Sequence, residues 1–290
     1  MRILVTGASG YLGWHLVRRL ESSHEVTAAC GSNPVAFARA RTTSVDLSDP
    51  ASIRALARTA APDSVIHAAA ITDVGACQHD PAVARRVNTE GTASLLAESR
   101  RANPDAGFVL VSTDLVFDGA KPGGMYEESD DPAPLMAYGE TKLLAERAVL
   151  GAPGAVVLRS SLIYGPPSAP RPCFLEWMLA GLRAGTGSLF TDEFRSPVHV
   201  DDLAAAIEAV ATGRLSGLFH AGGPERISRH QFGRIAAQAH GLPAENARPA
   251  RQADVVTTTP RPADVSMDSR RLAGVTGLAF RDCREGLRGL

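Results

Sequence analysis

The sequence predicts an α/β fold, a doubly wound parallel sheet with a smaller C-terminal α/β region. Two observations lead to this prediction. Short apolar runs alternate with amphipathic helical segments over the first 163 residues, and the chain becomes rich in proline after Tyr164. Strands that alternate with helices indicate parallel pairing through crossover helices. With 290 residues, 44% of them hydrophobic, the chain can bury a large core.

Five segments have the composition of buried strands. Their apolar runs are too continuous for one face to be in water, as expected when helices cover both faces of a sheet. In chain order they are 2–7, 24–30, 64–70, 107–113 and 155–161, and a further short extended stretch precedes Asp46.

Helical segments lie between these strands. After the first strand, Leu12, Leu16 and Leu20 fall on one helix face. Two Asp-Pro pairs, at 49–50 and 80–81, supply an acidic N-cap and a proline at the first helical position. The expected helices are 12–22, 49–60, 80–101, 137–150, 173–185, 201–213 and 228–241, with loops at 164–172 and 243–262.

Composition and charge exclude several function classes. The chain has 30 basic and 31 acidic residues, so no overall field attracts nucleic acid or anionic lipid. No apolar run is long enough to span a membrane, and we expect a cytoplasmic protein. The four cysteines lie far apart, which fits reduced thiols better than a zinc site or a disulfide framework, and we expect no metal.

A glycine-rich turn follows the first strand. In TGASGYLG, residues 6–13, Gly7, Gly10 and Gly13 allow a tight turn, close approach to a pyrophosphate, and close packing of the helix on the sheet. The position between a first strand and a first helix predicts a Rossmann-type dinucleotide-binding domain. The spacing GxxGxxG, in place of GxGxxG, points to short-chain dehydrogenases.

The end of the second strand bears on which dinucleotide binds. An acidic side chain there would accept hydrogen bonds from the adenosine ribose, but CGSN, residues 30–33, contains no carboxylate. Ser32 could donate to a 2′-phosphate, and Arg39 or Arg41 could pair with it, although a solvated loop explains both arginines equally well. NADPH is therefore favoured, with NADH as the alternative.

The segment AYGETKLLAE, residues 137–146, contains one of the two lysines of the chain, the other being Lys121. In a helix, Tyr138 and Lys142 share one face at i and i+4. A nearby ammonium favours the phenolate and brings the tyrosine toward a useful acid-base range. A lysine, unlike an arginine, is also compact enough to reach a ribose hydroxyl. We interpret the pair as catalytic.

Hydroxyl side chains end the predicted strand 107–113. Ser112 and Thr113 fall at its carboxyl end, where open α/β sheets bind their ligands. A hydroxyl there could hydrogen-bond a substrate carbonyl, although such residues usually satisfy local backbone groups.

Taken together, these motifs resemble the extended short-chain dehydrogenases/reductases, and more narrowly the dTDP-4-dehydrorhamnose reductase branch of sugar-nucleotide enzymes. The resemblance covers nearly the whole chain. Its motifs occur in the family's order: TGASGYLG, VIHAAA, VNTEGT, STDLVFDG, YGETK, LRSSLIYG, FRSPVHVDDLA and FHAGGPERIS. It implies a dinucleotide-binding domain at 1–163, to which 196–222 return, and a substrate-binding region formed by 164–195 and 223–290.

The resemblance also assigns residues. Thr113, Tyr138 and Lys142 would be the catalytic triad, with Asn88 assisting through a water-linked proton path. Lys142 would hold the nicotinamide ribose and lower the tyrosine pKa. Thr113, Asp114, Arg195 and Arg261 would contact the substrate, the two arginines at its diphosphate. The residues assigned to the cofactor are Gly7, Ser9, Gly10, Tyr11, Leu12, Gly13, Ser32, Arg39, Asp46, Leu47, Ala68, Ala69, Ala70, Tyr138 and Lys142.

Four further residues receive structural or secondary interpretations. His67 would line the cofactor, Arg159 and His199 are interpreted as structural, and Glu193 is expected in a solvated turn. For Asp46, a role in the helix start before Pro50 is as plausible as a contact with adenine. The expected partner is a small molecule, in particular a sugar nucleotide, and a homodimer is allowed for.

Three alternatives remain. Proteins similar to this branch include non-catalytic NADP-binding regulatory subunits, for instance of methionine adenosyltransferase. A ketone without a nucleotide is another candidate substrate. Sugar-nucleotide epimerases and 4,6-dehydratases are the third, but dehydratases carry a glutamate after the motif STD. Here Leu115 follows Asp114, whereas the reductase branch usually has tyrosine, so the acid-base pair for elimination is incomplete.

Overall fold

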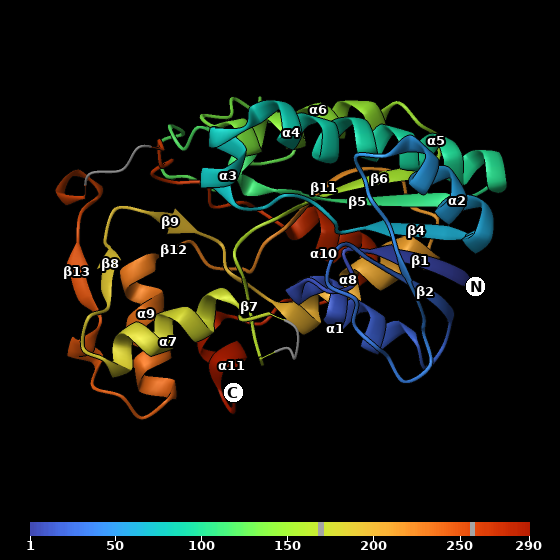
Figure 1. Cartoon of the computed structure of the whole chain (residues 1–290). Coiled ribbons are helices and arrows are strands. Elements are labelled where there is room, and N and C mark those ends of the chain that lie inside the picture. Colours follow the sequence, from blue (N-terminus) through green and yellow to red (C-terminus); the bar gives the residue numbers. More distant parts are fainter. Residues whose placement is uncertain (168–170, 256–258) are drawn as a thin grey trace.

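Seven parallel strands form the central sheet of the protein, whose structure is a computed structural model that describes residues 1–167, 171–255 and 259–290. The strand order is β11-β6-β5-β4-β1-β2-β3 (Figure 1). The strands are β1 (Arg2–Thr6), β2 (Glu25–Cys30), β3 (Arg41–Ser44), β4 (Ser64–His67), β5 (Gly107–Thr113), β6 (Ala155–Ser160) and β11 (Gly217–Ala221). The predicted doubly wound fold is confirmed.

Helices cover both faces of the sheet (Figure 1). On one face lie α2 (Pro50–Ala60), α5 (Gly91–Ala102) and α6 (Ala137–Leu150), whose apolar side chains pack on Leu4, Val65 and Leu110. On the other face α1 (Tyr11–Leu20) and α8 (Val200–Thr212) pack on Ile3, Val5 and Ile66. Successive residues of one strand therefore serve two separate cores, which explains the uninterrupted apolar runs.

The C-terminal half contributes to both parts of the molecule. β11 joins the sheet beside β6, and α8 packs against α1. The domain boundaries themselves remain predictions. Beside the sheet, at the left of Figure 1, α7 (Phe174–Arg183), α9 (Arg229–Ala239) and α11 (Cys283–Leu287) form a separate core with Tyr164 and Phe232.

Short strand pairs complete this second region. β9 (Phe194–Arg195) pairs with β12 (Ile227–Ser228), and β8 (Ser188–Phe190) pairs with β13 (Arg248–Ala250). The remaining elements are β7 (Ile163–Tyr164), β10 (Val198–His199), α3 (Val74–His79), α10 (Arg270–Thr276) and the 3₁₀ turns η2 (Asp114–Val116), η3 (Ala244–Asn246) and η4 (Gln252–Asp254).

Two expectations about secondary structure are wrong. The segment 243–262 is not loop throughout, since it contains β13, whose pairing with β8 depends on tertiary contact. The single helix expected at 80–101 is instead α4 (Pro81–Arg85), a π-helical turn η1 (Arg86–Glu90) and α5. Residues 168–170 and 256–258, which fall in the two expected loops, lie outside the described residues.

Candidate active site

The glycine-rich turn lies at the carboxyl edge of the sheet, where the strand order reverses. From β1 the chain first adds β2 and β3 on one side, then β4, β5 and β6 on the other, and Thr6 pairs with His67 at the strand ends. This topological switch point is where such sheets bind ligands. The sequence motif and the topology therefore select the same location.

The glycines of this turn are required by close backbone contacts. Gly7 has φ +73°, and a Cβ there would lie 2.8 Å from the nitrogen of Ala69. A Cβ on Gly13 would lie 2.0 Å from the carbonyl oxygen of Gly7. Gly10 is the N-cap of α1 and has no side-chain cap, so N–H groups of the first helical turn remain available to an anion. The turn fits a dinucleotide pyrophosphate.

Several predicted cofactor residues surround the turn. Ser9 and Gly10 are partly exposed, as are Ala68, Ala69 and Ala70 at the end of β4. The N–H of Ala69 donates to the hydroxyl of Thr6 over 3.4 Å, which links the two strand ends. The structure thus brings these predicted residues together.

Tyr11 and Leu12 begin α1 beside this group. The Tyr11 hydroxyl donates to the carbonyl oxygen of Pro166 over 3.0 Å, and Leu12 is 8% exposed. Their N–H groups belong to the first turn of the helix, so both residues can serve the cofactor through the main chain, whatever their side chains contact.

The arginines proposed for the 2′-phosphate lie elsewhere. Ser32 is exposed directly after β2, but the N–H of Arg39 donates to Glu21, the residue that ends α1 at the opposite edge of the sheet. Arg41 pairs with Thr27, three residues before the end of β2, and so roughly 10 Å short of that end. The structure does not bring either arginine's backbone to the glycine-rich turn.

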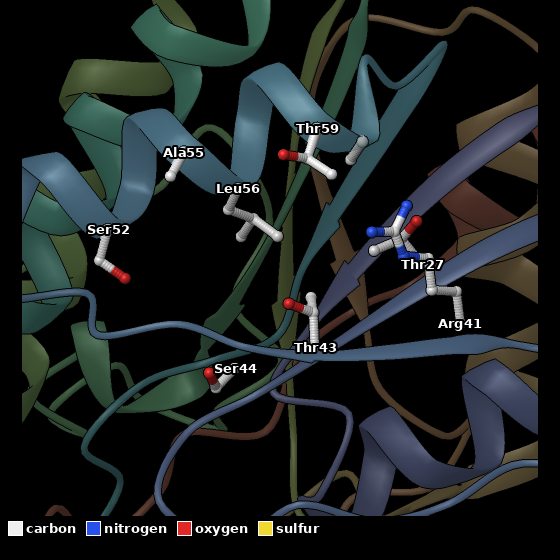
Figure 2. Close-up of a pocket in the computed structure, with 9 residues that line it drawn as sticks. Thr27, Arg41, Thr43, Ser44, Ser52, Ala55, Leu56 and Thr59 are labelled. Carbon is white, nitrogen blue, oxygen red and sulfur yellow. The ribbon is translucent and has the colours of Figure 1, made fainter.

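Arg41 instead borders a hollow of about 260 Å³ at the open edge of the sheet (Figure 2). The hollow lies between β3 and α2, and Arg41 is the one lining residue that was proposed for the site. Its lining residues are Thr27, Arg41, Thr43, Ser44, Ser52, Ala55, Leu56, Thr59 and Ala60. This hollow is therefore separate from the candidate active site.

The segment expected to border adenine makes local contacts. Asp46 accepts hydrogen bonds from the N–H and hydroxyl of Ser48, which lower its pKa, and Leu47 is buried in the core. The cap of α2 is Asp49, which accepts from Ala51 and Ser52. Asp46 thus forms the turn before the helix, and its contact with adenine remains a prediction.

The proposed catalytic triad converges at the carboxyl end of β5. Tyr138 and Lys142 lie on α6, 9% and 2% exposed, and Thr113 ends β5 at 7%. The Thr113 hydroxyl donates to the Asp114 carboxylate over 3.3 Å and lies close enough to the Tyr138 hydroxyl to oppose the rise in its pKa. The Lys142 ammonium donates to the carbonyl oxygen of Val111 over 2.8 Å. Three residues that are up to 29 positions apart in the sequence therefore meet at one strand end, and their catalytic roles remain predictions.

The pKa of Tyr138 is shifted in the direction opposite to the one expected from the sequence. Burial raises the pKa of Tyr138, an effect opposed by the Thr113 hydroxyl and reinforced by the charge of Asp114. Burial also lowers the pKa of Lys142 to about 8, against the opposing influence of Glu146. The expected lowering of the tyrosine pKa by Lys142 is not found, because the ammonium donates to the carbonyl oxygen of Val111.

Asn88 occupies the π-helical turn η1 and is 1% exposed. Its side-chain oxygen accepts from the N–H of Ile71 over 2.8 Å, and its amide nitrogen donates to Thr141 over 3.1 Å. Single π turns inside helices are frequent at functional sites. The turn places Asn88 against α6, although no periodicity in the sequence indicated the interruption.

A buried ion pair that the sequence pattern did not predict joins α6 to β6. Glu146 accepts from Arg159 over 2.8 Å and from the hydroxyl of Ser112 over 2.5 Å, and both charged side chains are almost completely buried. Arg159 also lies over the ring of Phe117. The structural interpretation of Arg159 is confirmed, whereas Glu146 could have been noticed as a charge four residues after Lys142 on a buried face.

The substrate side of the site contains a cluster of buried charges. Glu193, expected in a solvated turn, is 1% exposed, so that expectation is wrong. It contacts Arg229 at 2.8 Å, Arg195 at 3.2 Å and Arg261 at 3.5 Å, and these arginines hold its pKa low despite burial. The side chain of Glu193 is buried because distant segments supply its countercharges, which no local pattern reveals.

Asp114 extends this charged cluster toward the triad. Burial raises its pKa, while Arg195, 3.8 Å away, and a hydrogen bond from Ser161 of 2.9 Å oppose the shift. Arg195 is therefore shared between two carboxylates and 6% exposed. The side chain of Arg261 is 48% exposed and lies over the ring of Phe190, so it is the more accessible of the two arginines assigned to the diphosphate.

Two histidines have structural surroundings. His67 has no exposed surface and its ring contacts Thr6 and Thr92, so it lies behind the glycine-rich turn and does not line a cofactor surface. His199 is 2% exposed and caps α8 through its ring nitrogen, as expected. The first assignment is corrected, because its polar atoms already have partners in the interior.

Within the described ranges, no group of three or more His, Cys, Asp or Glu side chains could hold a metal ion. In the same part of the chain, no helix has both the length and the apolar character to cross a bilayer. The four cysteines, Cys30, Cys77, Cys173 and Cys283, are buried and free of disulfides.

Comparison with known proteins decides the family. A model described as "RmlD substrate binding domain" matches residues 1–290. The chain belongs to this family. That membership, together with the relatives below, confirms the predicted resemblance to dTDP-4-dehydrorhamnose reductases and the prediction of an NAD(P)-dependent oxidoreductase.

Curated relatives have two kinds of name. A probable dTDP-4,6-dihydroxy-2-methyloxan-3-one 4-ketoreductase from Streptomyces antibioticus is 34% identical over 99% of this chain and 94% of its own length. Methionine adenosyltransferase 2 subunit beta from Mus musculus is 31% identical over 93% of this chain and 81% of its own length. The chain is thus similar both to a reductase and to a subunit named for another enzyme.

Solved structures share the whole fold. A hypothetical dTDP-4-dehydrorhamnose reductase from Sulfolobus tokodaii has a TM-score of 0.84 and 32% identity, with 98% of each chain covered. MoeE5 in complex with UDP-glucose and NAD has a TM-score of 0.82 and 28% identity, with 99% of this chain and 96% of its own covered. Family membership therefore applies to the entire chain, including the charged cluster.

Proposed function

We propose that the protein catalyses the NADPH-dependent reduction of a keto group on a nucleotide-diphosphate 4-keto-6-deoxyhexose. The observation that carries the proposal is the convergence of Thr113, Tyr138 and Lys142 at the carboxyl end of β5, on the same edge of the sheet as the glycine-rich turn. A bound nicotinamide would supply the hydride. The remaining steps are the work of this chain's own residues.

Tyr138 is suited to donate the proton that the reduced oxygen needs. Because burial raises its pKa, the phenol stays protonated at neutral pH. Its hydroxyl would give that proton to the carbonyl oxygen, and Thr113 beside it would orient the same oxygen. Positioned acids of this kind contribute roughly 10²–10⁴-fold to the rate.

Lys142 would change partner when the cofactor binds. Its ammonium now donates to the carbonyl of Val111, and with a pKa of about 8 it is mostly charged at neutral pH. A ribose hydroxyl could accept one of its three N–H groups, and the charge would then lie closer to the tyrosine. Asn88, fixed on the adjacent turn, would complete the water-linked path by which Tyr138 regains a proton.

The charged cluster supports an anionic substrate. Three arginines, Arg195, Arg229 and Arg261, lie within 3.5 Å of the carboxylate of Glu193, and Arg195 is also 3.8 Å from Asp114. Arg261 is the exposed member and would pair with a diphosphate oxygen, while Arg195 would act from within the cluster. MoeE5, a structural relative, binds UDP-glucose, which is a ligand of the same class.

NADPH is proposed because the end of β2 offers no carboxylate to a ribose hydroxyl. Exposed Ser32 would contact the 2′-phosphate, whereas Arg39 receives no support from its place near the end of α1. NADH remains the alternative, since MoeE5 holds NAD. Cytoplasmic location and a homodimer are expectations of the same proposal.

The decisive experiment combines cofactor and substrate. Purified protein is mixed with NADPH and a panel of nucleotide-linked 4-keto-6-deoxyhexoses and nucleotide-free ketones, and oxidation is followed at the NADPH absorbance. Turnover with the nucleotide-linked sugars and not with the free ketones supports the proposal. Turnover only with free ketones would reassign the substrate class.

A dehydratase or epimerase is tested in parallel by incubating dTDP-glucose with the protein and NAD. Leu115 follows Asp114 and cannot transfer a proton, so we expect no product lighter by one water in the mass spectrum. The appearance of that product would overturn the reductase assignment.

A second candidate function is a non-catalytic regulatory subunit. The similarity to methionine adenosyltransferase 2 subunit beta favours it, at 31% identity. NADPH binding without oxidation of the cofactor by any ketone of the panel would support this role instead. Retention of all three triad side chains argues for the enzyme.

A further inference from the structure

A buried chain of hydrogen bonds starts behind the glycine-rich turn. The hydroxyl of Thr6, at the end of β1, lies 2.6 Å from Nδ1 of His67, at the end of β4, and neither residue has exposed surface. The same hydroxyl oxygen accepts the N–H of Ala69, which faces Gly7 across the turn. The first link of the chain therefore belongs to the cofactor side of the site.

The next links fix the direction of every hydrogen bond. The hydroxyl of Thr92 on α5 donates to the carbonyl oxygen of Asn88 over 2.6 Å, so it can only accept from Nε2 of His67, 2.9 Å away. Nε2 of His67 therefore carries the proton and Nδ1 accepts from Thr6. Burial, with the charge of Lys142, lowers the pKa of His67 to about 3, which keeps the ring neutral.

The chain continues from the π-helical turn to the catalytic helix. Asn88 donates from its side chain to the hydroxyl of Thr141, and that hydroxyl donates to the carbonyl oxygen of Tyr138 over 2.8 Å. A parallel bond runs from Thr89 to the carbonyl oxygen of Thr141 over 2.8 Å. Thr141 lies between Tyr138 and Lys142 in the sequence. It accepts hydrogen bonds from the π-helical turn at both its hydroxyl and its carbonyl oxygen.

We propose that His67 and Thr92 are positioning residues. They hold the π-helical turn η1 in place, and through Asn88 this turn keeps Tyr138 and Lys142 correctly placed relative to the glycine-rich turn. The inference rests on the proposed function. None of the bonds from Thr6 to Asn88 can be replaced by water, because the residues concerned are at most 1% exposed. Loss of one link leaves a buried donor or acceptor unpaired and favours a shifted turn.

The test removes the hydroxyl of Thr92 and keeps the shape of the side chain. Thr92→Val breaks the bonds to both His67 and Asn88, and Thr92→Ser restores a hydroxyl at the same place. Thr212→Val is the matched control, because Thr212 donates to the carbonyl oxygen of Glu208, four residues earlier on α8, in the same geometry. Three quantities are measured: kcat, the Kd for NADPH, and hydrogen exchange of residues 138–142.

We expect Thr92→Val to lower kcat about tenfold or more, because small displacements of catalytic groups are costly. The Kd for NADPH should rise by a smaller factor than kcat falls, because the glycine-rich turn keeps its own contacts with the cofactor while Lys142 is displaced, and exchange of 138–142 should accelerate. Thr92→Ser should recover most of the rate, and Thr212→Val should leave all three quantities unchanged. A purely structural hydroxyl would alter thermal stability without this division between kcat and Kd.

Several outcomes overturn the inference. Unchanged exchange and kcat in Thr92→Val do so, as does a loss that Thr212→Val shares or that Thr92→Ser fails to restore. If Thr92→Val does not fold, Thr6→Val is used instead, because it removes the other hydroxyl that is hydrogen-bonded to His67. This variant must then accelerate hydrogen exchange of residues 138–142. If the wild type reduces no ketone, the proposed function fails separately, since the exchange measurement needs no substrate.

Discussion

The cofactor side and the substrate side of the candidate site differ in how their polar groups are held. Around the glycine-rich turn, contacts run through backbone and neutral side chains, such as Thr6, His67 and Asn88. Around Glu193, carboxylates and arginines from distant segments neutralise one another in the interior. Leaving a buried neutral donor or acceptor unpaired costs about 1–3 kcal/mol, whereas breaking a buried ion pair costs about 3–5 kcal/mol.

This difference indicates on which side of the site a single substitution should lower activity without unfolding the protein. On the cofactor side each link is one of several, so a single change should reduce activity and leave the fold intact. On the substrate side Glu193 contacts three arginines, so its loss should threaten the fold itself. If this contrast holds, substitutions in the charged cluster should reduce stability most, and substitutions at exposed positions on the cofactor side should have the mildest effects.

Glu193→Gln should cause the largest loss of stability. The change leaves Arg195 and Arg229 without their shared countercharge in a buried place, and we expect unfolding in urea to become easier by about 3–5 kcal/mol. The matched control is Asp192→Asn, at the neighbouring position, whose pair with Arg251 is exposed and worth less than about 1 kcal/mol. Equal effects of the two changes would show that the cluster is not a buried electrostatic unit.

Tyr138→Phe should cause the largest loss of turnover on the cofactor side. Removing the proton donor should lower kcat by roughly 10²-fold or more, with the Kd for NADPH nearly unchanged because the ring remains. Tyr164→Phe is the control, a buried tyrosine in the core beside α7 and α9. A wild-type rate in the Tyr138 variant would exclude it as the general acid.

Affinity for NADPH should fall as the pH rises above about 8. In the free protein the pKa of Lys142 is lowered to about 8, so the ammonium that would hold the ribose is present below that pH and lost above it. The Kd should therefore be flat below pH 8 and rise by up to about tenfold per pH unit above it. Titrations by cofactor fluorescence can follow this change.

Variants of the two lysines show whether the pH dependence of NADPH affinity comes from Lys142 or from the protein as a whole. Lys142→Met should bind NADPH with an affinity independent of pH in this range, whereas Lys121→Met should retain the wild-type dependence. Lys121 pairs with Asp130 in a different segment, away from α6. A dependence on pH that survives in Lys142→Met would contradict the assignment.

The smallest effect concerns the choice of cofactor. The protein should favour NADPH over NADH in kcat/KM, and Ser32→Asp should reduce that preference by roughly five- to tenfold. A carboxylate at this exposed position repels a 2′-phosphate by about 1 kcal/mol. Ser32→Asn, equal in size and uncharged, should keep the preference. A tenfold preference of the wild type for NADH would be inconsistent with the proposed cofactor.

The fold was largely predictable because its signals are local. The strand 107–113 and the helix 137–150 match β5 and α6 residue for residue, since an apolar run or a helical spacing is complete within one element. The break at 86–90 was not predictable. A π turn inserts one residue into a helix without changing its composition, and what stabilises it is the contact of Asn88 with Ile71 and Thr141.

The candidate site divides in the same way. By itself the sequence determined the glycine-rich turn, the pairing of Tyr138 with Lys142 and the place of Thr113, because each depends on spacing along one element and on a parallel sheet that aligns strand ends. Only the tertiary structure decided the burial of Glu193, the distance of Arg39 from the turn and the raised pKa of Tyr138. Burial and electrostatics depend on which distant segments pack together, and a linear pattern does not contain that information.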